Sequence, residues 1–195
     1  MKSEGTVVDA RERLLAAAYS LFSRQGIGAV GIDTIIAEAG VAKMSLYRHF
    51  DSKEGLVLAF LERRDRHWTL DWLETEVLRR ASDPEGRLLA IFDLFHDWFQ
   101  EPGFEGCAFI SVLLESPPEG RIRAAAAECL AHKRAIVRRF ASEAGLAQVE
   151  SFAHTWHMLM KGSIVSAQEG HRHAARDARK AAAVILETWP RKERD

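Results

Sequence analysis

The chain has little of what secreted or membrane proteins depend on. It holds two cysteines in 195 residues, too few for a disulfide framework or a cysteine-based zinc site. The longest apolar stretch, residues 106–114, is far shorter than the run of about twenty apolar residues that a membrane-spanning helix requires. The N-terminal residues also lack the apolar stretch of a secretory signal. These absences predict a cytoplasmic protein with no membrane partner.

The sequence also lacks an excess of charge of one sign and the groups of residues that form enzyme active sites. The formal net charge is −1, which excludes a uniformly basic nucleic-acid-binding protein. The sequence has no glycine-rich phosphate loop and no nucleophile–base set, so neither an enzyme activity nor a cofactor is predicted. His154 and His157 are three residues apart, and His171 and His173 lie near Glu169 and Asp177, but neither set forms a complete, closely spaced group of ligands. No metal site is predicted.

Prolines and glycines are few and fall mostly between stretches of helical periodicity. The chain has five prolines and thirteen glycines, and apolar positions between them repeat every three or four residues. The predicted fold is therefore all-α. Expected helices include residues 51 to about 80, residues 147–169 and residues 174–189. Residues 1–8 are expected to form a loose arm.

Local signals predict how three of the helices begin or pack. The spacing of a capping box occurs at two helix starts, Asp9 with Glu12 and Asp51 with Glu54. Residues 106–114 are apolar on every side, which predicts a helix buried in the core.

Residues 31–53 contain two short expected helices joined by a tight turn. The first, ending at Ala39, has apolar residues at helical spacing. Gly40 follows at a turn position that requires positive φ. The second, residues 43–50, needs only Leu46 and Phe50 on its buried face, because these two residues are four apart. Its other side chains are mostly cations and hydrogen-bond donors. This arrangement is typical of a DNA-reading helix-turn-helix.

Several ordered blocks of sequence lie around this motif. They are Phe22 to Gly26, the Ala39-Gly40-Val41 turn, Leu46-Tyr47-x-His49-Phe50 and Ser52-Lys53-Glu54. With these blocks, the first quarter of the chain resembles the TetR/AcrR family of bacterial transcriptional regulators. The resemblance implies a three-helix DNA-binding domain over residues 1–54. It also implies a helical ligand-binding and dimerisation domain over residues 55–195.

The resemblance assigns DNA contacts to the second helix of the motif and its neighbours. The expected DNA-binding residues are Thr34, Lys43, Met44, Ser45, Tyr47, Arg48, His49 and Lys53. Tyr47, His49 and Lys53 match family positions that contact phosphate. Arg48 has two open roles, bidentate contact with guanine or binding of phosphate.

Two positions depart from the family pattern. Gly31 replaces a threonine that caps the first helix of the motif and meets a phosphate, and Thr34 is the possible substitute. Ala42 replaces a serine that often caps the second helix. These departures leave the phosphate contacts less defined than the reading helix itself.

The C-terminal domain is expected to hold an effector and to form the dimer. Candidate ligand-binding residues are Trp68, Trp72, Phe92, Phe95, Phe109, Trp156 and Met160. Their aromatic bias favours a small hydrophobic or aromatic effector, although each of them alternatively fills the core. The last two helices are expected to pair with their symmetry mates. Candidate interface residues are Trp156, Met160, Ser163 and Ala167, with intrachain packing as the alternative.

These features together predict a homodimeric, ligand-responsive transcriptional regulator. It is expected to be a repressor that binds a palindromic operator and is released by its effector. One alternative is an all-helical enzyme or small-molecule carrier with an incidental helix-turn-helix. Another is a regulator of the same family without a ligand. The sequence identifies neither the operator nor the effector.

Overall fold

Helices make up almost all of the regular structure. The computed structural model describes residues 9–193, so the expected arm of residues 1–8 lies outside the described range. Within that range the only β-pairing is an isolated bridge between Leu146 and Arg191, and the prediction of an all-α fold is confirmed. None of the helices described is long and apolar enough to cross a membrane.

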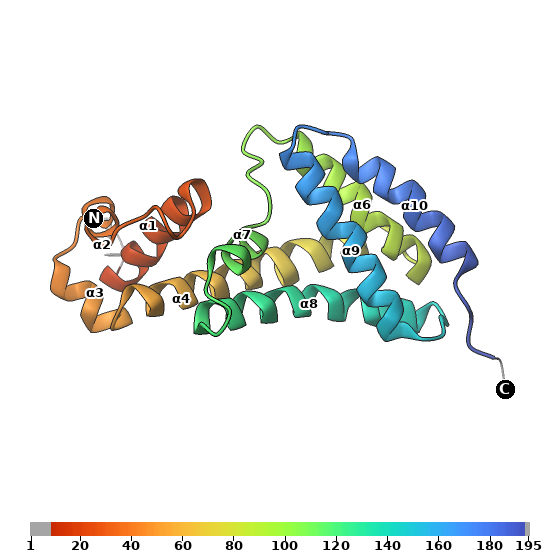
Figure 1. The fold of residues 1–195 in the computed structure, drawn as a ribbon, viewed down its shortest axis with the longest axis horizontal. Coiled ribbons are helices and arrows are strands. Elements are labelled where there is room, and N and C mark those ends of the chain that lie inside the picture. The colour runs from red at the N-terminus through yellow and green to blue at the C-terminus, as the bar shows by residue number, and fades with distance from the viewer. Residues whose placement is uncertain (1–8, 194–195) are drawn as a thin grey trace, which may run out of the picture. The chain divides into compact units, whose positions relative to one another are not determined.

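The described chain packs as two compact units. The first contains the residues up to Arg64 together with Ala108–Ala127, and the second contains Asp65–Cys107 together with the residues from Glu128 onward. The helices, labelled in Figure 1 where there is room, are α1 (Ala10–Gln25), α2 (Ile32–Ala39), α3 (Lys43–Phe50), α4 (Lys53–Asp65), the π-helix η1 (Arg66–Glu74), α5 (Thr75–Arg80), α6 (Pro84–Gln100), α7 (Ala108–Glu115), α8 (Arg121–Glu143), α9 (Val149–Gln168) and α10 (Ala174–Thr188).

In the first unit, α1 packs against both α2 and α3. Phe22 of α1 lies edge-on to Phe60 of α4, with ring centroids 5.4 Å apart. Arg64 donates to the Ser23 hydroxyl at 2.6 Å, and Arg63 pairs with Glu12. The capping box predicted for α1 is therefore wrong. Asp9 makes no side-chain cap, and the Glu12 carboxylate is held by an arginine of α4 instead.

The junction between α3 and α4 also differs from the sequence prediction. Asp51 ends α3 with φ of 60°, so it does not have the extended backbone of an N-cap residue. Ser52 caps α4 in its place, and its Oγ accepts a hydrogen bond from the Gly55 backbone N–H at 3.1 Å. A Cβ at Gly55 would overlap the Phe50 carbonyl oxygen, which makes glycine necessary at this junction.

In the second unit, α10 packs along α6 and α9 (Figure 1). Asp83 caps α6 by accepting a hydrogen bond from the Gly86 backbone N–H at 2.7 Å, with Pro84 in the first turn. The buried faces of α6 and α9 meet through aromatic side chains, and Phe92 and Trp156 have ring centroids 5.5 Å apart. This aromatic layer forms the centre of the unit.

The helix expected to run from residue 51 to about residue 80 contains a π-helical segment. Helical structure continues from Lys53 to Arg80, but η1 occupies Arg66–Glu74. Lys133 of α8 fixes the start of this segment: its Nζ lies 2.9 Å from Asp65 Oδ1 and 2.7 Å from Thr69 Oγ1. His132 lies on the other oxygen of Asp65, at 2.5 Å.

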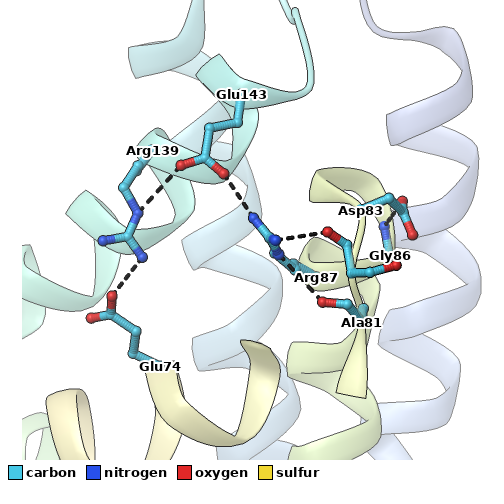
Figure 2. A network of polar contacts seen from close by, with 8 residues as sticks. Glu74, Ala81, Asp83, Gly86, Arg87, Arg139 and Glu143 are labelled. Carbon is cyan, nitrogen blue, oxygen red and sulfur yellow. Dashed lines mark hydrogen bonds and ion pairs between the residues drawn. The ribbon is translucent and has the colours of Figure 1, made fainter. Parts of the chain in front are cut away.

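A second polar network fixes the end of η1 (Figure 2). Arg139 of α8 lies 2.7 Å from Glu74, and Glu143 joins it to Arg87 of α6. Arg87 also donates to the carbonyl oxygens of Ala81 and Ser82, in the turn before α6. The π-helix is thus anchored at both ends by side chains of α8.

The prediction of a helix buried on all sides at residues 106–114 is wrong. The helix itself forms as α7, but only Phe109 and Val112 are buried in it. Leu114 is 73% exposed. The apolar composition of the segment gave no signal of which face would be left uncovered.

Candidate nucleic-acid interface and ligand-binding residues

The turn between α2 and α3 has the geometry that the sequence predicts. Gly40 adopts φ of 59° and ψ of 42°, and the Val41 N–H bonds to the Ile36 carbonyl, which closes α2 as a Schellman motif. Arg13 of α1 donates to the Gly40 carbonyl at 2.8 Å. A Cβ at Gly40 would lie 2.7 Å from Nη2 of the same arginine, so both the turn and its anchor require glycine.

The second helix of the motif, α3, buries the two predicted side chains and exposes most of the others. Leu46 and Phe50 are buried, and the Arg11 guanidinium lies over the Phe50 ring at 5.2 Å. Met44 is 71% exposed, and Tyr47 and Arg48 are also exposed. Ser45 and His49 are partly buried at its edges. One side of a short helix therefore carries the sulfur, hydroxyl and guanidinium groups.

Lys43 at the start of α3 already has an acidic neighbour. Its Nζ lies 3.1 Å from Asp33 Oδ1 of α2, and both side chains are more than half exposed. The hydrogen bond to Asp33 and the charge of that carboxylate raise the pKa of Lys43 above its usual value. The ammonium group is therefore positioned across the turn, toward the helix that precedes it.

Lys53 makes a hydrogen bond to the backbone of a distant segment. Its Nζ donates to the Ile27 carbonyl at 2.7 Å, which ties the segment between α1 and α2 to the start of α4. An ammonium group has three N–H donors, so this bond leaves donors for a phosphate. Lys53 thus combines a structural contact with a position close to the end of α3.

The departures from the family pattern have visible structural consequences. Gly31 and Ala42 stand at the N-caps of α2 and α3, and neither helix has a side-chain cap. Thr34 is exposed in the first turn of α2. The N–H groups at both helix starts are consequently uncapped by side chains, which favours acceptance of an anion there.

Six of the seven ligand-binding candidates lie in the second unit, and Phe109 lies in the first. Trp68 and Trp72, both on η1, contact each other and Trp98 of α6, with centroids 4.6 Å apart for Trp68–Trp72 and for Trp68–Trp98. Phe95 lies against the same Trp98 at 5.7 Å. Sequence reasoning missed Trp98 as a site candidate. Its spacing of three residues from Phe95 on one helix face was the available signal.

Trp156 belongs to a separate aromatic group formed by α6 and α9. Phe152 stacks on it at 4.9 Å, and Phe92 lies at 5.5 Å on a tilt of 56°. Met160 follows one helical turn later and is also buried. The six candidates of the second unit therefore fall into a tryptophan cluster at η1 and an aromatic layer on α9.

The four interface candidates are buried within one chain. Trp156, Met160, Ser163 and Ala167 are each at most 4% exposed. The exposed large apolar side chains of the last two helices are Met158, Val165 and Val184. The sequence pattern identified the buried stripe of α9, and the opposite side of that helix carries the exposed apolar side chains.

The histidines are engaged or buried. His171 lies 2.9 Å from Asp177, and His154 lies 3.7 Å from Glu150. Burial, together with the nearby charges of Lys161 and Arg134, lowers the pKa of His157 to about 3. Within residues 9–193, no group of three or more histidine, cysteine or acidic side chains has the arrangement of a metal site.

The N-terminal part of the chain is similar in sequence to known regulatory proteins. Residues 14–60 match the family model described as bacterial regulatory proteins of the tetR family. The transcriptional activator FasR of Mycolicibacterium smegmatis is 40% identical over 93 residues, which cover 46% of this chain and 40% of FasR. The repressor KstR2 of the same organism is 36% identical over 85 residues, 42% of this chain and 39% of KstR2. The matched region thus spans about two fifths of these relatives.

Structural similarity extends over most of the chain. The crystal structure of a TetR-family transcriptional regulator from Streptomyces coelicolor superposes with a TM-score of 0.80 at 28% identity. The match covers 91% of this chain and 88% of that one. The prediction of the family is confirmed by the sequence and structural matches together.

Proposed function

Because the chain belongs to the TetR family of bacterial regulatory proteins, we propose that it is a transcriptional regulator that binds operator DNA through α3. The exposed face of α3 is the observation that supports this most directly. Arg48 is exposed between Tyr47 and His49, and the residues described include no hydrogen-bond or ion-pair partner for it. An exposed guanidinium without a partner in the described chain can make a bidentate contact with guanine in the major groove.

The DNA-binding form is proposed to be a homodimer. A helix-turn-helix protein reads two half-sites with two copies of its reading helix, so its operator has matching two-fold symmetry. The uncapped starts of α2 and α3, with Lys53 nearby, would bind phosphates beside each half-site. Each α3 would then contribute Lys43, Met44 and Ser45 to the groove.

Regulation is proposed to be repression relieved by a hydrophobic or aromatic effector in the second unit. Such an effector reduces operator affinity by the difference in its binding free energy between the DNA-bound and the released form. The aromatic side chains on η1, α6 and α9 supply the surface for a ligand of that kind. The continuous helical stretch from Lys53 to Arg80 links that region to the reading helix along the chain.

Selection from a random pool of duplex DNA tests the operator proposal. The full chain and its Arg48→Ala variant are each carried through selection and sequencing, with Arg138→Ala as the matched control. Arg138 is an exposed arginine paired with Glu150, and both residues lie in the second unit. We expect a palindromic site for the wild type and the control, and selectivity reduced about tenfold or more in Arg48→Ala. Binding that is salt-sensitive but independent of sequence would refute the proposal.

A reporter gene placed behind the selected site tests whether the protein represses or activates transcription. FasR is named an activator and KstR2 a repressor, so these relatives do not decide it. Repression predicts that reporter expression falls when the protein is present and stays high with the Arg48→Ala variant. An increase in expression that depends on Arg48 would show activation instead.

A further inference from the structure

Trp156 carries a polar group that the polypeptide leaves without a partner. Its side chain is fully buried, and no hydrogen-bond acceptor for its Nε1 occurs among the residues described. Nearly all buried polar groups in native proteins are hydrogen-bonded, and an indole N–H can only donate. Phenylalanine at this position would provide an aromatic ring without an unpaired donor. The indole therefore indicates an acceptor that comes from outside the polypeptide.

The surroundings of Trp156 restrict the chemistry of that acceptor. Phe152 stacks on the indole at 4.9 Å and Phe92 lies 5.5 Å away, and all three side chains are fully buried. An ionised oxygen in such a place would lose its hydration and gain a single hydrogen bond from a neutral donor in return. A neutral oxygen loses much less hydration. The aromatic neighbours favour an apolar skeleton around it.

We propose that Trp156 Nε1 donates a hydrogen bond to an uncharged carbonyl oxygen of the effector, whose remaining structure is predominantly apolar. The inference rests on the proposed ligand-responsive function and specifies the ligand class of that site. Met160 lies one turn beyond Trp156 on the same helix face. Its unbranched, flexible side chain can change conformation and make room for a ligand beside the indole.

Trp189 provides a matched comparison within the same unit. Its Nε1 donates to the Ala147 carbonyl at 2.9 Å, and its ring lies edge-on to Phe152 at 5.2 Å. It is therefore a tryptophan with similar neighbours whose donor is already satisfied. A ligand carbonyl should engage Trp156 and leave the Trp189 hydrogen bond intact.

The test follows the indole N–H signals of the full chain by two-dimensional NMR. The chain has five tryptophans, and Trp156→Phe and Trp189→Phe assign two of the five signals. Two pairs of probes are titrated in the absence of DNA. Acetophenone is compared with ethylbenzene, and benzophenone with diphenylmethane. Within each pair, only the ketone carries an acceptor oxygen.

We expect each ketone to shift the Trp156 signal further downfield than its matched hydrocarbon does, because only the ketone accepts a hydrogen bond. Ketone affinity should fall about five- to tenfold in Trp156→Phe and stay unchanged in Trp189→Phe, as for loss of one hydrogen bond. The proposal fails if no ketone shifts the Trp156 signal up to its solubility limit, or if Trp156→Phe binds ketones as tightly as the wild type. Because no DNA is present, neither failure bears on operator binding. Likewise, failed operator selection would leave a positive titration standing.

Discussion

Among single residues, Asp33 is expected to limit how much positive charge the proposed reading helix offers to DNA. Its carboxylate lies 3.1 Å from Lys43 Nζ. In Asp33→Asn, Lys43 is released to bind phosphate and a nearby negative charge is lost. We expect operator affinity to rise about three- to fivefold, and the slope of log K against log salt to steepen by about 0.9, as for one more phosphate contact. Fluorescence anisotropy over a range of salt concentrations measures both quantities.

Glu38→Gln is the control for this effect. Glu38 is an exposed acid on the same helix, so its removal changes the net charge by the same amount. If the pairing with Lys43 is what matters, Glu38→Gln should leave the salt slope unchanged. Equal effects of the two variants would show that only the overall charge of α2 counts.

His157 should make the stability of the fold depend on pH. Its pKa is lowered to about 3 by burial and by nearby cations, whereas the pKa of a histidine in an unfolded chain is about 6.5. Between these values the unfolded chain binds a proton that the folded chain does not. Stability is therefore lost as the pH falls below about 6.5, by about 2 kcal/mol between pH 7 and pH 5 for this residue. Urea unfolding at the two pH values measures the loss.

In His157→Met this part of the pH dependence should disappear. The difference in unfolding free energy between pH 7 and pH 5 should shrink by about 2 kcal/mol relative to the wild type. His154→Gln, on the exposed side of the same helix, should keep the wild-type difference. A His157→Met curve parallel to that of the wild type would contradict the burial of a neutral imidazole.

Residue-level prediction succeeded where neighbours in sequence decide the outcome. The inward positions of Leu46 and Phe50 follow from their spacing of four on α3, and the left-handed conformation of Gly40 follows from its place after α2. The spacing of Glu12 predicts a capping box, but the structure pairs its carboxylate with Arg63. That partner comes from α4, and local periodicity carries no information about such a distant contact.

Among the elements, η1 depends most clearly on distant side chains. Lys133 joins Asp65 to Thr69 at the start of the π-helix, and it also donates to the Cys129 carbonyl of its own helix. Burial, the largest influence, raises the pKa of Asp65, but the charge of Lys133 and the hydrogen bonds of Thr69 and His132 outweigh it, so the pKa lies below the usual value. The helical periodicity of residues 51–80 predicted a helix without this π-helical segment, because its anchors lie more than sixty residues later.

Lys133→Met should expose this dependence. The variant leaves the Asp65 carboxylate in a largely buried place without its cation, and we expect about 3 kcal/mol of stability to be lost in urea unfolding. The double variant Asp65→Asn with Lys133→Met removes both charges and should recover part of that loss. Asp65→Asn alone completes the comparison. If the stability lost in the double variant equals the sum of the losses in the two single variants, the pair does not act as a unit.

For the whole molecule, the proposed dimer requires an apolar face that one chain leaves exposed. Met158 and Val165 are seven residues apart on α9, and so lie on one side of that helix. Val184 is exposed on α10, which packs against α9. Sequence patterning found both helices but selected the buried stripe of α9, since periodicity alone does not distinguish a core-facing stripe from a partner-facing one.

Met158→Glu combined with Val184→Glu should separate the proposed dimer. Placing carboxylates in an apolar contact between two copies costs their hydration and provides no partner, so association should weaken at least a hundredfold. Sedimentation at micromolar concentration would then show a monomer. Leu114→Glu is the control, because Leu114 is even more exposed but lies on α7 in the other unit. A monomer with Leu114→Glu and a dimer with the α9–α10 variant would place the interface elsewhere.

The same variant links assembly to DNA reading. A monomer has only one copy of α3, so it should bind a palindromic operator little better than an isolated half-site. Its unchanged reading helix should still prefer that half-site over random DNA. Arg48→Ala should show the reverse behaviour, with a stable dimer and reduced selectivity in each half-site. These opposite outcomes separate the surface that joins two chains from the surface that reads the bases. Full selective binding by the monomer would mean that one α3 is enough, and the symmetric operator would lose its physical basis.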